Sequence, residues 1–334
     1  MKQSAVPWIV VALMAVYVYG LTYHAKTRAP REPVYDFYDT ACVSVFIQDQ
    51  DLHDVYGQYN NILEGQRQLV KATKVGNGPF KLTFQVNSPR PATLYIDDEP
   101  VEIFLVPGDT SLIVTTWFNQ ESYYLDSLDF IGKMSGICQY YLRKQKEFER
   151  LHLRNTPHII ASEDMVDYAG KLDSMAAKEL SFLVQQGVYS ALPDWFVNFE
   201  RAEILYQKAY LKLSASFNRE GGNPMVDDVP LDNQAAVFSY YYYLYLNTFF
   251  AQTESEGKIS SPDPDQIQQS HLKEADMRLS EGPHDVFLTR AIFARLDAGN
   301  LDLAGELLEQ FEDTFYSKKY VRFLRMQLEK RNSL

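Results

Sequence analysis

The two cysteines of this chain are the residues that could carry redox chemistry, and they lie far apart in the sequence. Cys42 is in a β-branched segment, and Cys138 is in a segment with a helical pattern. A dithiol oxidoreductase uses Cys-x-x-Cys, because one thiolate attacks the substrate disulfide and its neighbour resolves the mixed disulfide. The sequence contains no such motif. Three interpretations stay open: two buried thiols, a structural disulfide that ties the strands to the first helix, or, least favoured, reactive thiols.

Acidic residues and a histidine between positions 49 and 54 resemble the opening of a calcium-binding loop. In this segment, Asp-Gln-Asp-Leu-His-Asp, alternate carboxylates could converge on one cation. An EF-hand has Gly where Asp54 stands and Glu where Asn60 stands, so we interpret the segment as a solvated strand end or turn. His152 and His158 have a spacing that matches no zinc motif. We therefore expect neither a metal nor a cofactor.

Other catalytic signatures are absent from the sequence. It contains no His-Glu-x-x-His and no Gly-x-Ser-x-Gly, and Gly221-Gly222 lacks the lysine and the preceding strand of a phosphate-binding loop. Asp227 and Asp228 lie in a turn-rich loop, where carboxylates ordinarily face solvent. The sequence therefore predicts a protein that is not an enzyme, and a hydrolase with dispersed acidic residues remains a minor alternative.

An aromatic run between positions 238 and 250 could serve either binding or packing. Exposed rings could stack on a sugar or receive a peptide, and this interpretation makes Tyr240, Tyr241 and Tyr243 a candidate aromatic groove. The spacing of other rings in the run instead favours a buried helix face, made by Phe238, Tyr242, Tyr245 and Phe249. Core packing is the favoured interpretation, and the groove is the alternative.

Composition limits the classes of partner. The chain has 334 residues with 46% hydrophobic residues, which is enough for more than one packed unit. Its net charge is −12, and no basic stripe is visible that could neutralise nucleic-acid phosphates. We therefore expect no nucleic-acid partner.

The N-terminal residues have the composition of a membrane segment. No charge occurs between Gln3 and Tyr23, and a helix of this length spans a hydrocarbon core of about 30 Å. We predict a membrane anchor at 1–24 and a polar, proline-bearing tether at 25–39. A cleaved signal peptide is the alternative, although Val18-Tyr19-Gly20 is a poor match to a cleavage site.

The next part of the chain has the pattern of short strands. Residues 80–86 alternate apolar and polar side chains, and turn-forming residues separate this segment from its neighbours. A spacing of roughly ten residues between strands favours a small antiparallel sandwich or barrel, which we assign to 40–120. The predicted strands are 42–47, 66–74, 80–86, 92–96, 101–106 and 111–117.

After about residue 120 the hydrophobic period changes to that of helices. One helix face runs from Met165 to Leu183, and Pro193-Asp194 opens a second helix with Asp194 as N-cap. We predict another helix at 232–251, a break at 254–265, and three short helices at 285–296, 301–311 and 316–330. The fold class is therefore α+β, with an all-α domain at 121–334.

Two segments of the strand region resemble a known β domain. Residues 78–84 (Gly-Pro-Phe-Lys-Leu-Thr-Phe) and 101–114, with Pro-Gly-Asp at 107–109, are similar to the N-terminal domain of TlpA-like thiol-disulfide oxidoreductases of the bacterial envelope. Residues 204–206 and 243–250 are similar to the helical region of those proteins. The family carries its Cys-x-x-Cys in a thioredoxin-like domain, which would begin near Leu334. No catalytic residue can therefore be transferred to this chain.

The resemblance implies a single-pass protein of the bacterial inner membrane with its body in the periplasm. It outweighs the flanking charges, since Lys26, Arg28 and Arg31 slightly favour a cytoplasmic body. We expect a non-catalytic accessory module that binds a protein partner, for which a separate thioredoxin-like protein is one candidate. An alternative is a tetratricopeptide-like scaffold, because residues 290–308 have the composition of a helix-turn-helix unit, although only one such unit is visible.

Overall fold

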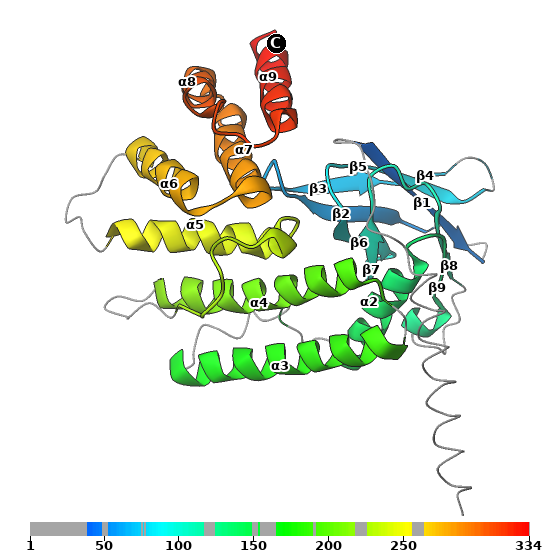
Figure 1. Cartoon of the computed structure of the whole chain (residues 1–334). Coiled ribbons are helices and arrows are strands. Elements are labelled where there is room, and N and C mark those ends of the chain that lie inside the picture. Colours follow the sequence, from blue (N-terminus) through cyan, green and yellow to red (C-terminus); the bar gives the residue numbers. More distant parts are fainter. Residues whose placement is uncertain are drawn as a thin grey trace, which may run out of the picture.

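The computed structural model describes residues 39–48, 53–74, 76, 78–116, 124–148, 153, 165–189, 192–217, 226–255 and 264–333. Its β-sheets lie in the N-terminal part and its α-helices follow, which confirms the α+β class (Figure 1). The predicted membrane anchor and nearly all of the tether lie outside the described residues. Among the residues that are described, no helix is long and apolar enough to span a membrane.

Nine strands form two sheets in the described part of the chain. The sheets pack face to face, and their inward side chains share one hydrophobic cluster. The five-stranded sheet has the order β4 (Thr73–Lys74), β5 (Phe80–Val86), β1 (Asp39–Ile47), β8 (Leu112–Thr116) and β9 (Asp129–Ile131). The four-stranded sheet has the order β3 (Gln66–Lys71), β2 (Val55–Asn61), β6 (Arg90–Ile96) and β7 (Glu99–Leu105).

Strand β5 shows how the sequence pattern builds this sandwich. Its four apolar side chains are buried and the three polar side chains between them are exposed, as predicted. Strands β6 and β7 form a hairpin, which Asp97 and Asp98 connect with φ values of 51° and 67°. Two consecutive positive φ values give the tight turn that matches strand twist, and Asp tolerates this conformation.

The prediction of a wholly antiparallel sandwich is wrong, because β1 and β8 pair in parallel. After β1 the chain forms β2 and β3 in the four-stranded sheet and returns to the five-stranded sheet as β4 and β5. It crosses again to form β6 and β7, and then β8 joins the five-stranded sheet beside β1. Alternation of side chains specifies which face is buried but not the direction of the neighbouring strand. A last strand, β9, lies beyond the predicted end of the strand region at residue 120.

Strand β2 was not predicted from its sequence. Gly57 is its third residue, and a Cβ atom there would be 2.5 Å from the Phe84 ring. The glycine therefore lets the two sheets approach closely, although it weakens the strand pattern in the sequence.

The described residues contain eight α-helices and two short 3₁₀ helices. Helix α8 has the predicted bounds. Helix α4 begins with Asp194 itself, so the prediction of Asp194 as N-cap is wrong by one residue: the Pro193 carbonyl accepts the first helical hydrogen bond, from the Val197 amide. Helix α6 falls where no helix was predicted, because its polar composition hides the helical period. The 3₁₀ helices are Tyr124–Ser127 and Gln234–Ala236, and the α-helices are α2 (Ser135–Phe148), α3 (Met165–Tyr189), α4 (Asp194–Phe217), α5 (Tyr240–Ser255), α6 (Pro264–Arg278), α7 (Glu281–Asp297), α8 (Leu301–Phe311) and α9 (Lys318–Asn332).

The helices stack in the order of the sequence from α3 to α7 (Figure 1). Both α8 and α9 pack against α7, whereas α2 lies against β7 and β9 of the sandwich. Helix α4 is central: one of its faces joins the core of the sandwich and the other joins the core of the C-terminal helices. The sandwich and the helical stack are thus connected by shared packing.

Candidate functional site

The three tyrosines of the candidate groove lie at the start of α5, in different environments. Tyr243 is fully buried and donates a hydrogen bond to the Val237 carbonyl, with a distance of 3.0 Å. Tyr240 and Tyr241 are half-buried. Tyr243 therefore packs in the core, and Tyr240 and Tyr241 are the two rings of the three with surface that a ligand could touch.

Arg290 joins these tyrosines to the sandwich. Its guanidinium lies 5.7 Å from the Tyr240 ring centroid and 5.3 Å from that of Tyr243, and it donates to the Ile62 carbonyl in the β2–β3 turn. Burial lowers the pKa of Arg290, while both tyrosines favour the charged form. Ile62 itself is buried in the core of the C-terminal helices. This contact positions the sandwich on α7, and the sequence had no local signal for it.

Both cysteines are free thiols in the structure, so the disulfide between them is not formed. Cys42 is half-buried on β1, with its Sγ 3.9 Å from the Thr83 hydroxyl. Cys138 is fully buried on α2 and accepts a hydrogen bond from the Phe104 amide at 3.4 Å. Burial raises the pKa of Cys138 to about 12, which leaves it without the thiolate needed for reaction.

Asp227, one of the two acidic residues considered for a hydrolase, belongs to a network of four charges. Its carboxylate lies 3.0 Å from the ammonium groups of both Lys208 and Lys212, and the same two lysines contact Asp173 on α3. Burial opposes ionisation of Asp173, but the two ammonium groups lower its pKa overall. Asp228 is exposed. The structure therefore uses Asp227 to hold its loop against α3 and α4.

A second network of charges lies inside the molecule between α2, α3 and α4. The Lys144 ammonium is 2.7 Å from a carboxylate oxygen of Glu179 and 2.7 Å from one of Glu200. Tyr140 and Tyr141 also donate to Glu200, with distances of 3.2 Å and 2.9 Å. All of these side chains are buried. The network joins one charged side chain from each of the three helices, so loss of one member would leave buried charge uncompensated.

Metal-binding geometry is not found in the described ranges, where no three His, Cys, Asp or Glu residues are arranged to hold an ion. Of the calcium-like segment, residues 49–52 lie outside the described residues. His53 contacts the Asp97 carboxylate, which also accepts a hydrogen bond of 2.9 Å from the Asp54 amide. Positions 152 and 158 also lie outside the described residues.

Helix α9 presents a basic surface at the C-terminal end of the stack. It carries six Lys or Arg residues and one Glu, whereas the whole chain has a net charge of −12. Four of its side chains pack inward with α7 and α8, which leaves the charged side outward: Tyr320, Val321, Phe323 and Leu324. The sequence search for a basic stripe missed this helix because acidic residues elsewhere in the chain mask it.

Two basic side chains of α9 are available to a partner. Arg322 and Lys330 are exposed, and no carboxylate of the described residues pairs with them. By contrast, Arg325 pairs with Glu312 at the end of α8. Met326 lies in the same helix and is 52% exposed, which adds apolar area to the basic surface.

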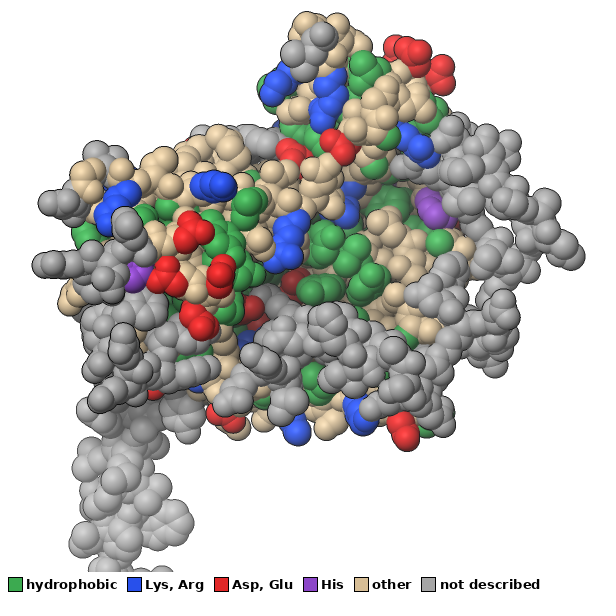
Figure 2. Space-filling model, turned by 180° about the vertical axis from the view of Figure 1, so that it is seen from behind, with side chains coloured by type: hydrophobic (Ala, Val, Ile, Leu, Met, Phe, Trp, Pro, Cys, Tyr) green, Lys and Arg blue, Asp and Glu red, His purple; other side chains and the backbone are tan. Residues whose placement is uncertain are grey.

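Other faces of the molecule carry different chemistry. Seen from behind, hydrophobic side chains are at the surface near the middle of the molecule, with acidic side chains gathered toward the left (Figure 2). The half-buried aromatic residues of α4 and α5 are Trp195, Tyr210, Tyr240, Tyr241 and Phe249. A ligand groove formed by these half-buried rings stays a prediction.

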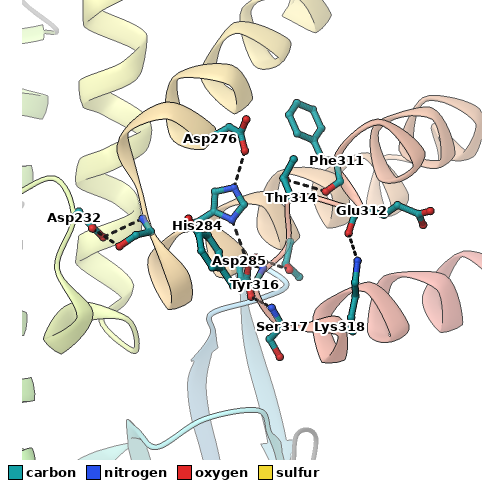
Figure 3. A network of polar contacts seen from close by, with 12 residues as sticks. Asp232, Asp276, His284, Asp285, Phe311, Glu312, Thr314, Tyr316, Ser317 and Lys318 are labelled. Atoms are coloured by element: carbon teal, nitrogen blue, oxygen red, sulfur yellow. Dashed lines mark hydrogen bonds and ion pairs between the residues drawn. The ribbon is translucent and has the colours of Figure 1, made fainter.

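A further polar cluster centres on His284 at the start of α7 (Figure 3). His284 and Asp285 are both 1% exposed, and they connect α6, α7 and the segment that leads into α9. Neither residue stood out in the sequence, because histidine beside aspartate has no catalytic or metal spacing of its own.

Comparison with known proteins adds no relative: no protein-family model matches the chain, and no curated protein matches it.

Proposed function

We propose that the chain is a non-catalytic, membrane-tethered protein of the bacterial envelope whose helical stack binds a protein partner. The observation that carries the proposal is the exposed basic surface of α9, with Arg322 and Lys330 outside any ion pair of the described residues. A basic surface on an acidic protein steers acidic partners toward one place and repels basic ones. We therefore propose an acidic protein surface as the partner.

The anchoring and the identity of the partner rest on the sequence. The uncharged segment before Tyr23 supports a tether, and the resemblance to TlpA-like oxidoreductases supports a periplasmic body. That resemblance makes a separately encoded thioredoxin-like protein the first partner to test.

A crosslinking experiment tests the proposal. A photoreactive amino acid replaces Arg322 in the full-length protein, and a control places it at Lys178, an exposed residue of α3. We expect crosslinks to one envelope protein from position 322 and not from 178. Identical products from both positions would contradict the assignment of the surface. Robust disulfide reductase activity of the purified protein would contradict the non-catalytic proposal.

A tetratricopeptide-like scaffold is the second candidate. Helices α7 and α8 form a helix-turn-helix unit with Gly299 at a φ of 77° in the turn. The stacking of consecutive helices also supports this alternative. The helices differ in length from 11 to 25 residues, which argues against one repeating period.

A further inference from the structure

His284 lies between two carboxylates that come from different helices (Figure 3). Its Nε2 atom is 3.0 Å from Asp276 on α6, and its Nδ1 atom is 3.2 Å from Asp285 on α7. The rings of Phe315 and Tyr316 pack edge-on against the imidazole. Both ring nitrogens therefore have an acidic neighbour, and aromatic rings keep water away from the imidazole.

The number of protons on the ring decides whether both contacts can be hydrogen bonds. A neutral imidazole has one N–H donor and one acceptor, whereas the imidazolium ion has two donors. An ionised carboxylate accepts hydrogen bonds and donates none. With two carboxylates on its two nitrogens, His284 satisfies both contacts only when it is positively charged.

Asp285 connects this histidine to the start of α9. Its carboxylate accepts hydrogen bonds from the backbone amides of Tyr316 and Ser317, with distances of 2.9 Å and 2.7 Å. Ser317 is the residue that precedes the first turn of α9. Asp285 thus holds the entry to α9, and His284 holds Asp285.

We propose that His284 is a pH-sensitive lock that joins α6, α7 and the entry to α9 while it is protonated. When His284 loses its proton, one of its two carboxylate contacts changes from a hydrogen bond into a contact between two acceptors. The two acidic side chains then lose the positive charge between them, so the packing of α6 and α9 on α7 weakens.

The groups around His284 favour the protonated form. Burial opposes the charge, but hydrogen bonds and charges from Asp285 and Asp276 outweigh it, so the pKa of His284 is raised above 6.5. Two further titratable side chains, Lys319 on α9 and Tyr243 on α5, interact with Asp285. The folded state therefore binds this proton more tightly than the unfolded state. The stability that this proton gives to the folded state is fully present below pH 6.5, the pKa of an unperturbed histidine. It is lost as the pH rises through the pKa of His284 in the folded protein.

This lock would control the partner surface, a consequence that rests on the proposed function. Arg322 and Lys330 lie on the helix whose entry Asp285 holds. Release of the lock at higher pH would therefore change how this surface is presented, and partner binding would weaken.

An NMR titration of the full-length protein tests the lock without any partner. Histidine side chains are labelled, and the signal of His284 is identified by its loss in the His284→Gln variant. We expect a titration midpoint above 6.5 for His284, and a lower midpoint in Asp276→Asn, because one of the two carboxylates is gone. A midpoint at or below 6.5, or one unchanged by Asp276→Asn, would overturn the proposal.

Thermal unfolding gives an independent readout. We expect the unfolding midpoint of the wild type to fall between about pH 6 and about pH 9 by more than that of His284→Gln, which cannot titrate there. Asp276→Asn replaces an exposed side chain, with 38% of it accessible, so this variant should fold even if His284→Gln does not. Equal pH dependence in wild type and Asp276→Asn would count against the lock. If the pH titration confirms the lock but the crosslinking experiment captures no partner, the proposed function is refuted and the lock is not.

Discussion

Replacing Lys144 by methionine should be among the most damaging single substitutions in this protein. Lys144 is the cation that two buried carboxylates share, and the side chains of Glu179 and Glu200 are 3% and 0% exposed. Methionine keeps most of the volume of lysine and removes the charge. The variant therefore removes the cation that these two buried acidic groups share.

The expected cost follows from the partners that remain. Removal of one member of a buried ion pair destabilises a protein by about 3–5 kcal/mol, because the other charge stays buried. Here Tyr140 and Tyr141 still donate to Glu200, and the Leu153 amide still donates to Glu179. Because these donors remain, we expect the free energy of unfolding to fall by about 3 kcal/mol, at the lower end of that range.

Urea unfolding of the full-length protein, followed by circular dichroism, measures this loss. Lys146→Met is the matched control two positions along the same helix, since Lys146 pairs with Asp126 at the surface and should cost about 0–1 kcal/mol. Equal small losses in both variants would refute the buried network.

Three further predictions concern backbone, interface and thiols. Gly132→Ala should cost about 2–4 kcal/mol in urea unfolding, because Gly132 has a φ of 126° and a Cβ would lie 2.5 Å from the Ser111 carbonyl oxygen. Arg290→Met removes the contact with Ile62, so it should lower the free energy of unfolding by about 1–3 kcal/mol. The sandwich and the helices should then unfold in two separate steps. A single unfolding transition at the wild-type midpoint would contradict this prediction. Cys42 should react with a thiol reagent faster than buried Cys138 in the folded protein, and both should react after unfolding without reductant; failure of both to react would indicate a disulfide.

Regular elements with a clear hydrophobic period were predictable from sequence. The alternation in β5 and the apolar stripe of α8 come from local spacing, which depends on no other part of the chain. Strand β2 was missed because its Gly57 serves a contact with Phe84, 27 positions away. The parallel pairing of β1 with β8 was also missed, because side-chain alternation carries no information on strand direction.

The buried network of Lys144 could not be predicted, because its members are distant in sequence. Lys144, Glu179 and Glu200 come from three helices, and each alone looks like a surface residue of an amphipathic helix.

The prediction for the tyrosine run was only partly right. Of the predicted buried helix face, Tyr242 and Tyr245 are buried as expected. Phe249 is only half-buried, and Phe238 is half-buried and precedes α5. Tyr243, placed in the candidate groove, is buried too.

The affinity of the full-length protein for its crosslinked partner, measured at several salt concentrations, tests the central proposal most directly. The test variant is Arg322→Glu with Lys330→Glu, and the control reverses two exposed charges elsewhere, Lys178 and Arg201. We expect wild-type affinity to fall with added salt, and to fall at least tenfold in the α9 variant, about 1.4 kcal/mol. The control should bind like wild type. Unchanged affinity in the α9 variant would contradict the proposal that α9 is the partner surface.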